Sequence, residues 1–395
     1  MSRRKGIRRG ILLAGILAAA CFFIPAARAD KYVTLTFTGD CTIGSEEKYR
    51  DWDDSFDSVA AREGYDYFFA NFRELFSEDD CTVINLEGVL YDSGYGERTK
   101  KTYRFRGRTE FVNILTAGSV ELAGIANNHI GDYGARGMQS TTDTLESAGI
   151  AWTRSMDGYV LEKDGIRVWV FAIDYGLYNS IREPLARKIA GIKASGEANA
   201  VVVIYHNGNE YDARHMIRQT RTGDYFIDAG ADAVIMHHSH VVQGIQVRNN
   251  RTILYSLGNF VFGGNRDIKT KYYQDVREVS SLYGLVAQLK LHFSNSGKYL
   301  GQQVILYPIY TSSAAPKNNF RPVRLTGEQA EPVIDAIRYD TPEEIEIPEA
   351  EDDGTGYVRI VMPYLSGGTE SPAERQRSVD GKPEKPPAKP ERSGQ

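Results

Sequence analysis

The sequence predicts an α/β fold: a layered, parallel-rich β-sheet core with helices on its outer faces and an added antiparallel sheet. Short apolar, β-branched runs alternate with stretches of helical apolar spacing from residue 33 to residue 257. Two later runs, 284–293 and 302–310, alternate apolar and polar residues as antiparallel strands do. The composition, 42% hydrophobic and 11% aromatic in 395 residues, suffices for a sizeable core. We therefore expect one main domain over residues 30–323.

The first half of this domain supplies three strands and three helices in alternation. The expected strands are 33–38 (VTLTFT), 82–86 and 120–126. The expected helices are 65–76, 110–117 and 135–148. Aromatic residues line one face of the first helix, Thr109 can cap the second, and Gly149 ends the third.

The second half begins with a hairpin over 159–173 that turns at Asp164-Gly165, a favoured turn pair. Helices at 181–194 and 214–229 flank an apolar strand at 200–205. A further apolar strand from residue 231 runs straight into three histidines, and another ends in Ser-Leu-Gly-Asn-Phe at 256–260. This order of strands and helices favours a mostly parallel sheet.

The two ends of the chain have different characters from the middle. Residues 1–29 combine arginines, an apolar run at 11–24 and Ala27-Arg28-Ala29, which is typical of a cleavable signal peptide. An uncleaved anchor and a lipoprotein at Cys21 are the alternatives. Residues 366–395 mix prolines with charges of both signs and are expected to be a disordered tail. The order of 324–365 is left open. We expect a periplasmic or extracellular protein, and the net charge of −5 gives no reason to propose nucleic acid as a partner.

Cys41 and Cys81 are expected to be free thiols. If Asp40 and Glu87 lie side by side at strand ends, six extended residues separate Cys81 from that level, about 20 Å. That separation is too long for a disulfide.

Five of the expected strands end at residues that can bind a metal. These residues are Asp40, Glu87, Asn128, His206 and His238. Because parallel strands in one sheet bring their carboxyl ends to a single edge, we expect these side chains to meet. Mixed carboxylate, amide and imidazole ligands suit Mn, Fe or Zn, as one or two divalent ions. Such ions could polarise a phosphoryl or carbonyl oxygen, with His129 placed to protonate a leaving group.

These motifs together resemble the CapA/PgsA family of capsule and poly-γ-glutamate biosynthesis proteins, whose fold is similar to the calcineurin-like metallophosphoesterases. The resemblance covers about residues 34–262. It lies in Gly39-Asp40, Asn85-Leu86-Glu87, Tyr103-Arg104-Phe105-Arg106, Ala126-Asn127-Asn128-His129, Asp132-Tyr133-Gly134, His206 with Glu210-Tyr211, His237 to Gln243, and Tyr255 to Phe260.

The resemblance implies a metallophosphoesterase-type core in which His129 is the proton donor. The implied metal ligands are Asp40, Glu87, Asn128, His206, His238 and His240. Three departures stand out: Thr42 where the phosphoesterases have the histidine of Asp-x-His, Asn207 where the family tends to have tryptophan, and Ser239 in place of proline. The first departure removes a ligand from one ion.

Several further residues have a functional and a structural interpretation. Arg104 and Arg106 could form an anion site or an exposed strand. Glu210 and Tyr211 could line the pocket or cap the next helix, and Asn259 could shape the loop near the metals. His237 is interpreted as a core histidine or one that supports the ligands, and His215 and His292 as surface residues.

Three functions fit these observations. The first is an exported protein with a metal-dependent hydrolase or transferase site, acting in the making, export or attachment of an anionic surface polymer. The second is a non-catalytic assembly factor that binds polymer or a membrane-bound synthase complex. The third is a broad metallophosphoesterase, because a shared fold does not determine the substrate. The sequence leaves the oligomeric state open.

Overall fold

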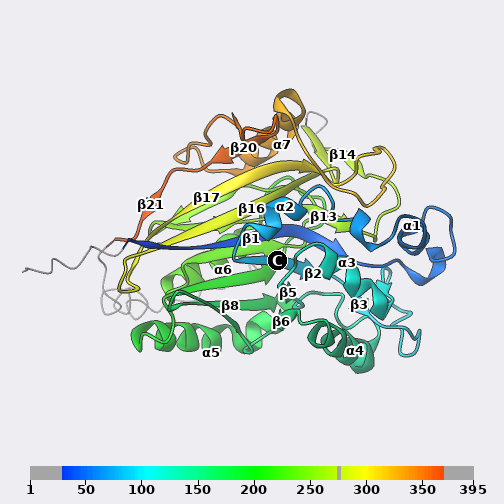
Figure 1. Cartoon of the computed structure of the whole chain (residues 1–395), viewed down its shortest axis with the longest axis horizontal. Coiled ribbons are helices and arrows are strands. Elements are labelled where there is room, and N and C mark those ends of the chain that lie inside the picture. The colour runs from blue at the N-terminus through cyan, green and yellow to red at the C-terminus, as the bar shows by residue number, and fades with distance from the viewer. Residues whose placement is uncertain (1–28, 274–276, 369–395) are drawn as a thin grey trace, which may run out of the picture.

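The structure, a computed structural model, describes residues 29–273 and 277–368. Within them, two β-sheets pack face to face, with helices on both outer sides (Figure 1). The predicted signal peptide lies outside the described residues except for Ala29, and the predicted tail does so from residue 369 onward. No helix in the described part of the chain is long and apolar enough to span a membrane.

The larger sheet has 11 strands among the described residues, in the order β19-β20-β17-β16-β1-β2-β5-β6, with β13 beside β1, and β18 and β21 beside β17. Its strands are β1 (Lys31–Thr42), β2 (Cys81–Leu86), β5 (Leu122–Gly124), β6 (Ala151–Thr153), β13 (Asn259–Phe262), β16 (Tyr283–Phe293), β17 (Tyr299–Tyr310), β18 (Val323–Arg324), β19 (Glu351–Asp352), β20 (Val358–Val361) and β21 (Leu365–Ser366). The strands β13, β1, β2, β5 and β6 are parallel, whereas β16 pairs antiparallel with both β1 and β17.

The smaller sheet has 6 strands among the described residues, in the order β11-β12-β10-β9-β8-β7. They are β7 (Tyr159–Lys163), β8 (Ile166–Asp174), β9 (Ala200–His206), β10 (Ala233–His237), β11 (Ile245–Arg248) and β12 (Arg251–Leu254). Short two-stranded ribbons are formed by β3 (Val89–Leu90) with β4 (Arg106–Gly107), and by β14 (Thr270–Tyr273) with β15 (Arg277–Ser280).

The division of the strands between two sheets differs from the arrangement that the sequence predicted. The expected single parallel sheet is divided between them, because β1, β2 and β5 belong to one sheet and β9 and β10 to the other. The antiparallel strands β16 and β17 do not form a sheet of their own but extend the one that contains β1, which Figure 1 shows as long neighbouring arrows. The mixed α/β class and the layered sheets are as predicted.

Among the described residues, all the α-helices except the last cover the outer faces of the sheets. The helices are α1 (Phe56–Glu63), α2 (Arg73–Ser77), α3 (Val112–Ala117), α4 (Gly134–Ser147), α5 (Tyr175–Ala194), α6 (Ile217–Asp228) and α7 (Gly327–Asp340). Residues of α1 to α4 share a buried cluster with the larger sheet, and residues of α5 and α6 share another with the smaller sheet. The core between the sheets contains Phe37, Leu122, Val202, Ile235 and Leu289.

The segment after residue 323 packs on the main fold. The apolar face of α7, which includes Ala330, Val333 and Ile337, is buried in the core between the sheets. Asp340 at the end of α7 accepts hydrogen bonds from the backbone N–H of His215 and of Gly244. The region that the sequence left open is therefore an integral part of the described fold.

Two local differences have a packing explanation. The predicted helix 65–76 is a short 3-10 helix η2 (Tyr65–Tyr67) followed by turns and α2, yet Phe68, Phe69, Phe72 and Phe76 are all buried as its pattern predicted. The short helix α1 was not predicted. As expected, Cys41 and Cys81 are buried and unpaired.

Candidate metal centre

The predicted ligands meet where the two sheets face each other at the carboxyl ends of their parallel strands. Glu87 follows β2, and Asn128 and His129 follow β5. From the other sheet, β9 ends at His206, and β10 ends at His237, which leads to His238 and His240. Two sheets, rather than the single edge expected from the sequence, therefore supply the ligands.

Asp40 lies inside β1, not just past it as predicted, and a register shift aims it at the centre. The pairing of β1 with β2 shifts between Phe37 and Asp40. Before the shift Phe37 faces the core between the sheets, whereas after it Cys41 faces the outer cluster. Because side chains alternate along a strand, Asp40 then points inward. Gly39 allows this path, since a Cβ there would lie 2.4 Å from the carbonyl oxygen of Gly258.

The Asp40 carboxylate is surrounded by donors. Its Oδ1 accepts a hydrogen bond of 2.7 Å from Asn85 Nδ2 and lies 3.3 Å from His237 Nδ1. Its Oδ2 accepts from the backbone N–H of His238 at 3.2 Å and lies 3.2 Å from His240 Nδ1. Burial opposes ionisation, but the hydrogen bonds and charges of His237 and His240 hold the pKa of Asp40 well below its usual range.

Glu87, unlike Asp40, has no hydrogen-bond donor for its carboxylate. It is fully buried, and neither carboxylate oxygen has a hydrogen-bond partner. Burial, with the Asp40 charge adding to it, raises the pKa of Glu87 well above its usual range. Three imidazole Nε2 atoms face Glu87 Oε1, at 3.6 Å from His129, 3.7 Å from His206 and 3.9 Å from His240. A buried carboxylate without donors is costly, and a cation bound among these atoms would offset that cost.

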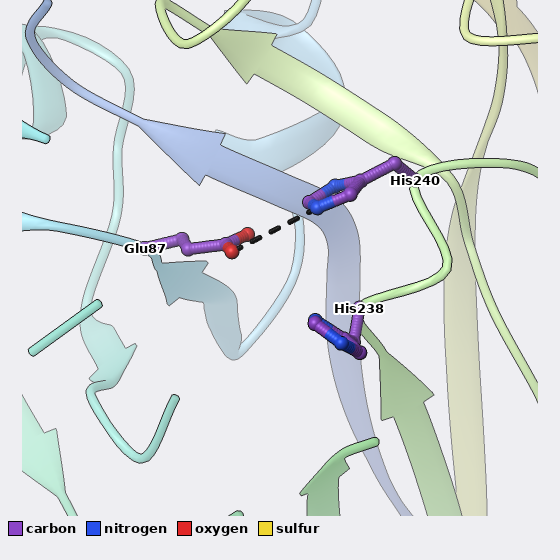
Figure 2. A group of neighbouring side chains, drawn as sticks. All are labelled: Glu87, His238 and His240. Atoms are coloured by element: carbon purple, nitrogen blue, oxygen red, sulfur yellow. Dashed lines mark ion pairs between the residues drawn. The ribbon is translucent and has the colours of Figure 1, made fainter. Parts of the chain in front are cut away.

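The histidines are held so that nitrogen atoms face the carboxylates. His240 Nδ1 lies 2.9 Å from Asn259 Oδ1, which leaves its Nε2 directed at Glu87 (Figure 2). His206 Nε2 lies 2.8 Å from Asn128 Oδ1, so these two predicted ligands are neighbours. His238 Nδ1 is buried without a partner. His238 and His240 also adopt positive φ angles, 101° and 56°, a strain that is typical of functional sites.

The histidines of the centre differ in the direction in which their pKa values are shifted. Burial holds the pKa of His206 well below its usual range and lowers that of His238 to about 4. His240 differs because, although burial lowers its pKa, the Glu87 and Asp40 charges raise it well above the usual range. His206 and His238 are therefore uncharged near neutral pH, and neutral imidazole is the form that binds metals.

The donor set fits divalent metal ions. Glu87, His238 and His240 offer ligand atoms within 4.8 Å of one another, and so do Asp40, Glu87 and His206. Glu87 belongs to both groups, so it is the residue that could bridge a pair of ions. Five of the six predicted ligands thus lie in one buried cluster, and half-buried Asn128 is joined to it through His206.

His129 is oriented by a network behind it. Its Nδ1 lies 2.7 Å from Asp132 Oδ2, which also accepts from the backbone N–H of Phe105. Lys101 Nζ donates to Asp132 Oδ1 at 2.6 Å and to the carbonyl oxygen of Asn128 at 2.7 Å. Asp132 therefore orients the ring with Nε2 toward Glu87, although burial lowers the pKa of His129.

The two arginines predicted for an anion site are engaged within the protein. Arg104 Nε donates to Glu97 Oε1 at 2.9 Å, and Arg104 Nη1 bonds the carbonyl oxygen of Lys101. Arg106 is buried, with its guanidinium donating to Glu47 Oε2 and to the carbonyl oxygen of Tyr91. Neither has the exposed, solvated position that was the alternative.

The remaining predicted residues flank the centre. Asn259 supports His240 directly. Tyr211 packs beside His240 with ring centroids 5.9 Å apart, and Glu210 next to it is exposed. His237 contacts Asp40 rather than Glu87, as expected of a residue that supports a ligand.

Lys101 and Asn85 contact residues of the centre but were not predicted to have a role. Both lie within or beside the motifs of the CapA/PgsA resemblance. Asn85 Nδ2 bridges Asp40 Oδ1 and His206 Nδ1, at 2.7 and 3.1 Å. Its position two residues before Glu87 was the available signal, because alternate residues of a strand share a face.

Comparison with known proteins shows the family of the chain. Residues 34–264 match the model of a family described as bacterial capsule synthesis protein PGA_cap. The chain is 28% identical to the capsule biosynthesis protein CapA of Bacillus anthracis, over 60% of this chain and 61% of that protein. It is 27% identical to the PGA biosynthesis protein CapA of Bacillus subtilis (strain 168), over 59% and 64% respectively. The chain thus spans less than two thirds of either relative.

A solved structure of a hypothetical protein from Thermus thermophilus overlaps loosely, with a TM-score of 0.40 and 13% identity over 70% of this chain and 99% of that one. The family match covers the strands and loops that carry every predicted metal ligand. The chain belongs to the PGA_cap family of bacterial capsule synthesis proteins, as the CapA/PgsA resemblance predicted.

Proposed function

We propose that this chain is an exported, metal-dependent hydrolase or transferase that acts in the making, export or attachment of an anionic surface polymer such as poly-γ-glutamate or capsule. The polymer class follows from the family and from the relatives named CapA. The partners on this proposal are the polymer and a membrane-bound synthase complex.

The environment of Glu87 is the observation that best supports metal-dependent chemistry. A fully buried carboxylate without a hydrogen-bond donor, faced by three imidazole nitrogens, is hard to explain as a purely structural feature. With Asp40 it offers negative charge to ions, whereas His206 and His238 offer neutral nitrogen. When bound, Mn, Fe or Zn ions would supply a Lewis-acidic centre for reaction at a phosphoester or amide.

The chain's own residues would divide the remaining work. Asp40, Glu87, His206, His238 and His240, with Asn128, would hold the ions. His129 directs Nε2 into the same space and would exchange a proton with the leaving group there, while Asp132 keeps its ring oriented. Buried surroundings would exclude bulk water and strengthen these electrostatic interactions.

A second function, a non-catalytic assembly factor, is favoured by Thr42. The residue stands where the phosphoesterases carry a histidine ligand, and its buried Oγ1 has no hydrogen-bond partner. A centre with one imidazole fewer could hold an ion for structure and bind polymer without cleaving it.

Turnover separates the two functions. Purified protein would be assayed with a nitrophenyl phosphodiester and a γ-glutamyl anilide in the presence of Mn, Fe or Zn. The hydrolase proposal expects turnover that falls about 10²- to 10⁴-fold in His129→Ala while bound metal is retained. His292→Gln, on β16, is the control and should keep wild-type rates. Metal binding without turnover of either substrate would favour the assembly factor.

A further inference from the structure

The cations that the sequence places nearest the centre are already engaged. Lys101 binds Asp132, Arg104 binds Glu97, and Arg106 binds Glu47. A substrate bearing negative charge would have to break one of these pairs to use them. Recognition of an anionic chain by side chains beside the metal centre therefore needs another cation.

Lys269 is such a cation. Its side chain is exposed, and no carboxylate lies within ion-pair distance of it among the described residues. Its Nζ lies 5.1 Å from the ring centroid of Tyr211 and 5.5 Å from that of Tyr103, so the ammonium group is near both rings. These distances are within the range of cation–π attraction, so the rings fix where the charge is presented.

The backbone around Lys269 is also tied down. Its N–H donates to Ser281 Oγ at 2.9 Å, and its carbonyl oxygen accepts from the N–H of Ser281 at 2.8 Å. The lysine is thus anchored to the segment just before β16.

Tyr211 links Lys269 to the metal centre. Its ring lies 5.9 Å from the ring of His240, and its backbone adopts a positive φ of 57°. The N–H of Tyr211 donates to the carbonyl oxygen of Ser239, and its hydroxyl accepts from Asn265 Nδ2 at 3.2 Å. Asn265 is itself buried and held by Asn318. The Tyr211 ring, fixed at both ends, is therefore near both His240 and Lys269.

We propose that Lys269, Tyr103 and Tyr211 form a subsite at the rim of the centre that binds a carboxylate of an anionic polymer chain. The ammonium group pairs with the carboxylate, and the tyrosine rings pack on the methylene groups of the chain. The subsite rests on the proposed function, whose family supplies the polycarboxylate class, and adds the residues that would bind it. Exposed Glu210, next to Tyr211, carries the opposite charge and weakens the attraction.

The test measures binding, so that it does not depend on turnover. A short fluorescent γ-glutamyl oligomer is titrated into the purified full chain, and its uncharged amide analogue is titrated in parallel. Lys269→Gln should weaken oligomer binding about fivefold, the upper value for an exposed ion pair, and Lys269→Arg should preserve it. Glu210→Gln should tighten binding. The matched control is Arg221→Gln, which removes an exposed cation from α6 and should leave binding unchanged.

Three outcomes would overturn the subsite. They are equal weakening by Lys269→Gln and Arg221→Gln, equal affinity of the wild type for the oligomer and its amide analogue, and no binding of the oligomer to the wild type. Metal content of each variant is measured in the same preparations. If the purified wild type contains no metal but Lys269→Gln still weakens oligomer binding, the proposed hydrolase is contradicted and the subsite is supported. Failure of the proposed function and failure of the subsite therefore give different results.

Discussion

Replacing Glu87 with glutamine should make the metal-free protein more stable. It should also reduce the stabilisation that the protein gains from added metal. In the absence of metal, the buried carboxylate has no hydrogen-bond donor, and its pKa is raised well above the usual range. Folding at neutral pH therefore carries the cost of shifting this pKa, about 1.4 kcal/mol for each tenfold change in the acid dissociation constant. Glutamine is also buried and polar but lacks this ionisation cost, so we take about 1–3 kcal/mol as the difference between the two proteins.

Added metal offsets the higher melting temperature of the variant. An ion at about 100 times its Kd stabilises the native state by about 2.7 kcal/mol. The entropy of unfolding is about 2.1 cal/mol/K per residue. For a fold of this size, a change of 1 kcal/mol in the free energy of unfolding therefore shifts the melting temperature by roughly 1.4 °C. In chelator, Glu87→Gln should thus melt about 1–4 °C above the wild type. Saturating Mn or Zn should raise the wild type by about 4 °C and the variant by much less.

Asp232 provides the control for this experiment. It is equally buried, but Arg251, Lys193 and the N–H of Val201 all donate to it. Asp232→Asn should therefore destabilise the protein by about 3–5 kcal/mol with or without metal. Thermal unfolding followed by circular dichroism measures both variants. If Glu87→Gln lowers the melting temperature in chelator, or gains as much from metal as the wild type, the assignment of Glu87 as a shared ligand is wrong.

Three further predictions concern the support of the centre and the fold. Asn259→Ala should lower metal affinity about 10- to 100-fold, because His240 loses the acceptor that orients it; calorimetry measures this, and an unchanged affinity would contradict it. Gly39→Ala should cost about 1–3 kcal/mol in denaturant unfolding, since the added Cβ meets the Gly258 carbonyl oxygen at 2.4 Å, and a neutral effect would contradict that contact. Burial raises the pKa of Asp79 to about 7, from about 3.8 when unfolded, so its contribution to stability is present at low pH and is lost as the pH rises toward 7. The melting temperature of Asp79→Asn relative to wild type should therefore be higher at pH 8 than at pH 5, and a difference independent of pH would contradict the shift.

The residues of the buried cluster could be predicted because their positions depend on local pattern. Parallel strands end at one side of a sheet, so Glu87, His206 and the histidines after β10 could be identified from where apolar runs stop. Which sheet each strand joins is not encoded locally. The division falls between β6, at one edge of the larger sheet, and β7, at one edge of the smaller sheet.

Other parts of the site depend on contacts between distant residues. Asp40 was expected after its strand, but a register shift inside β1 turns it inward, and no residue pattern marks that shift. Arg106 had the features of an anion-binding residue because its partner Glu47 is far away in sequence. The aromatic face of 65–76 was correctly assigned to the core although the helix is interrupted, since burial follows the apolar pattern more closely than backbone continuity does.

Elemental analysis of the protein purified without chelator shows whether the buried cluster binds metal. About two transition-metal ions per chain are expected. The ions should be lost in Asp40→Ala and His238→Ala, with far-UV circular dichroism unchanged, and retained in Arg221→Gln. Wild-type protein without metal, or full metal content in both ligand variants, would contradict the assignment of this buried cluster as a metal centre.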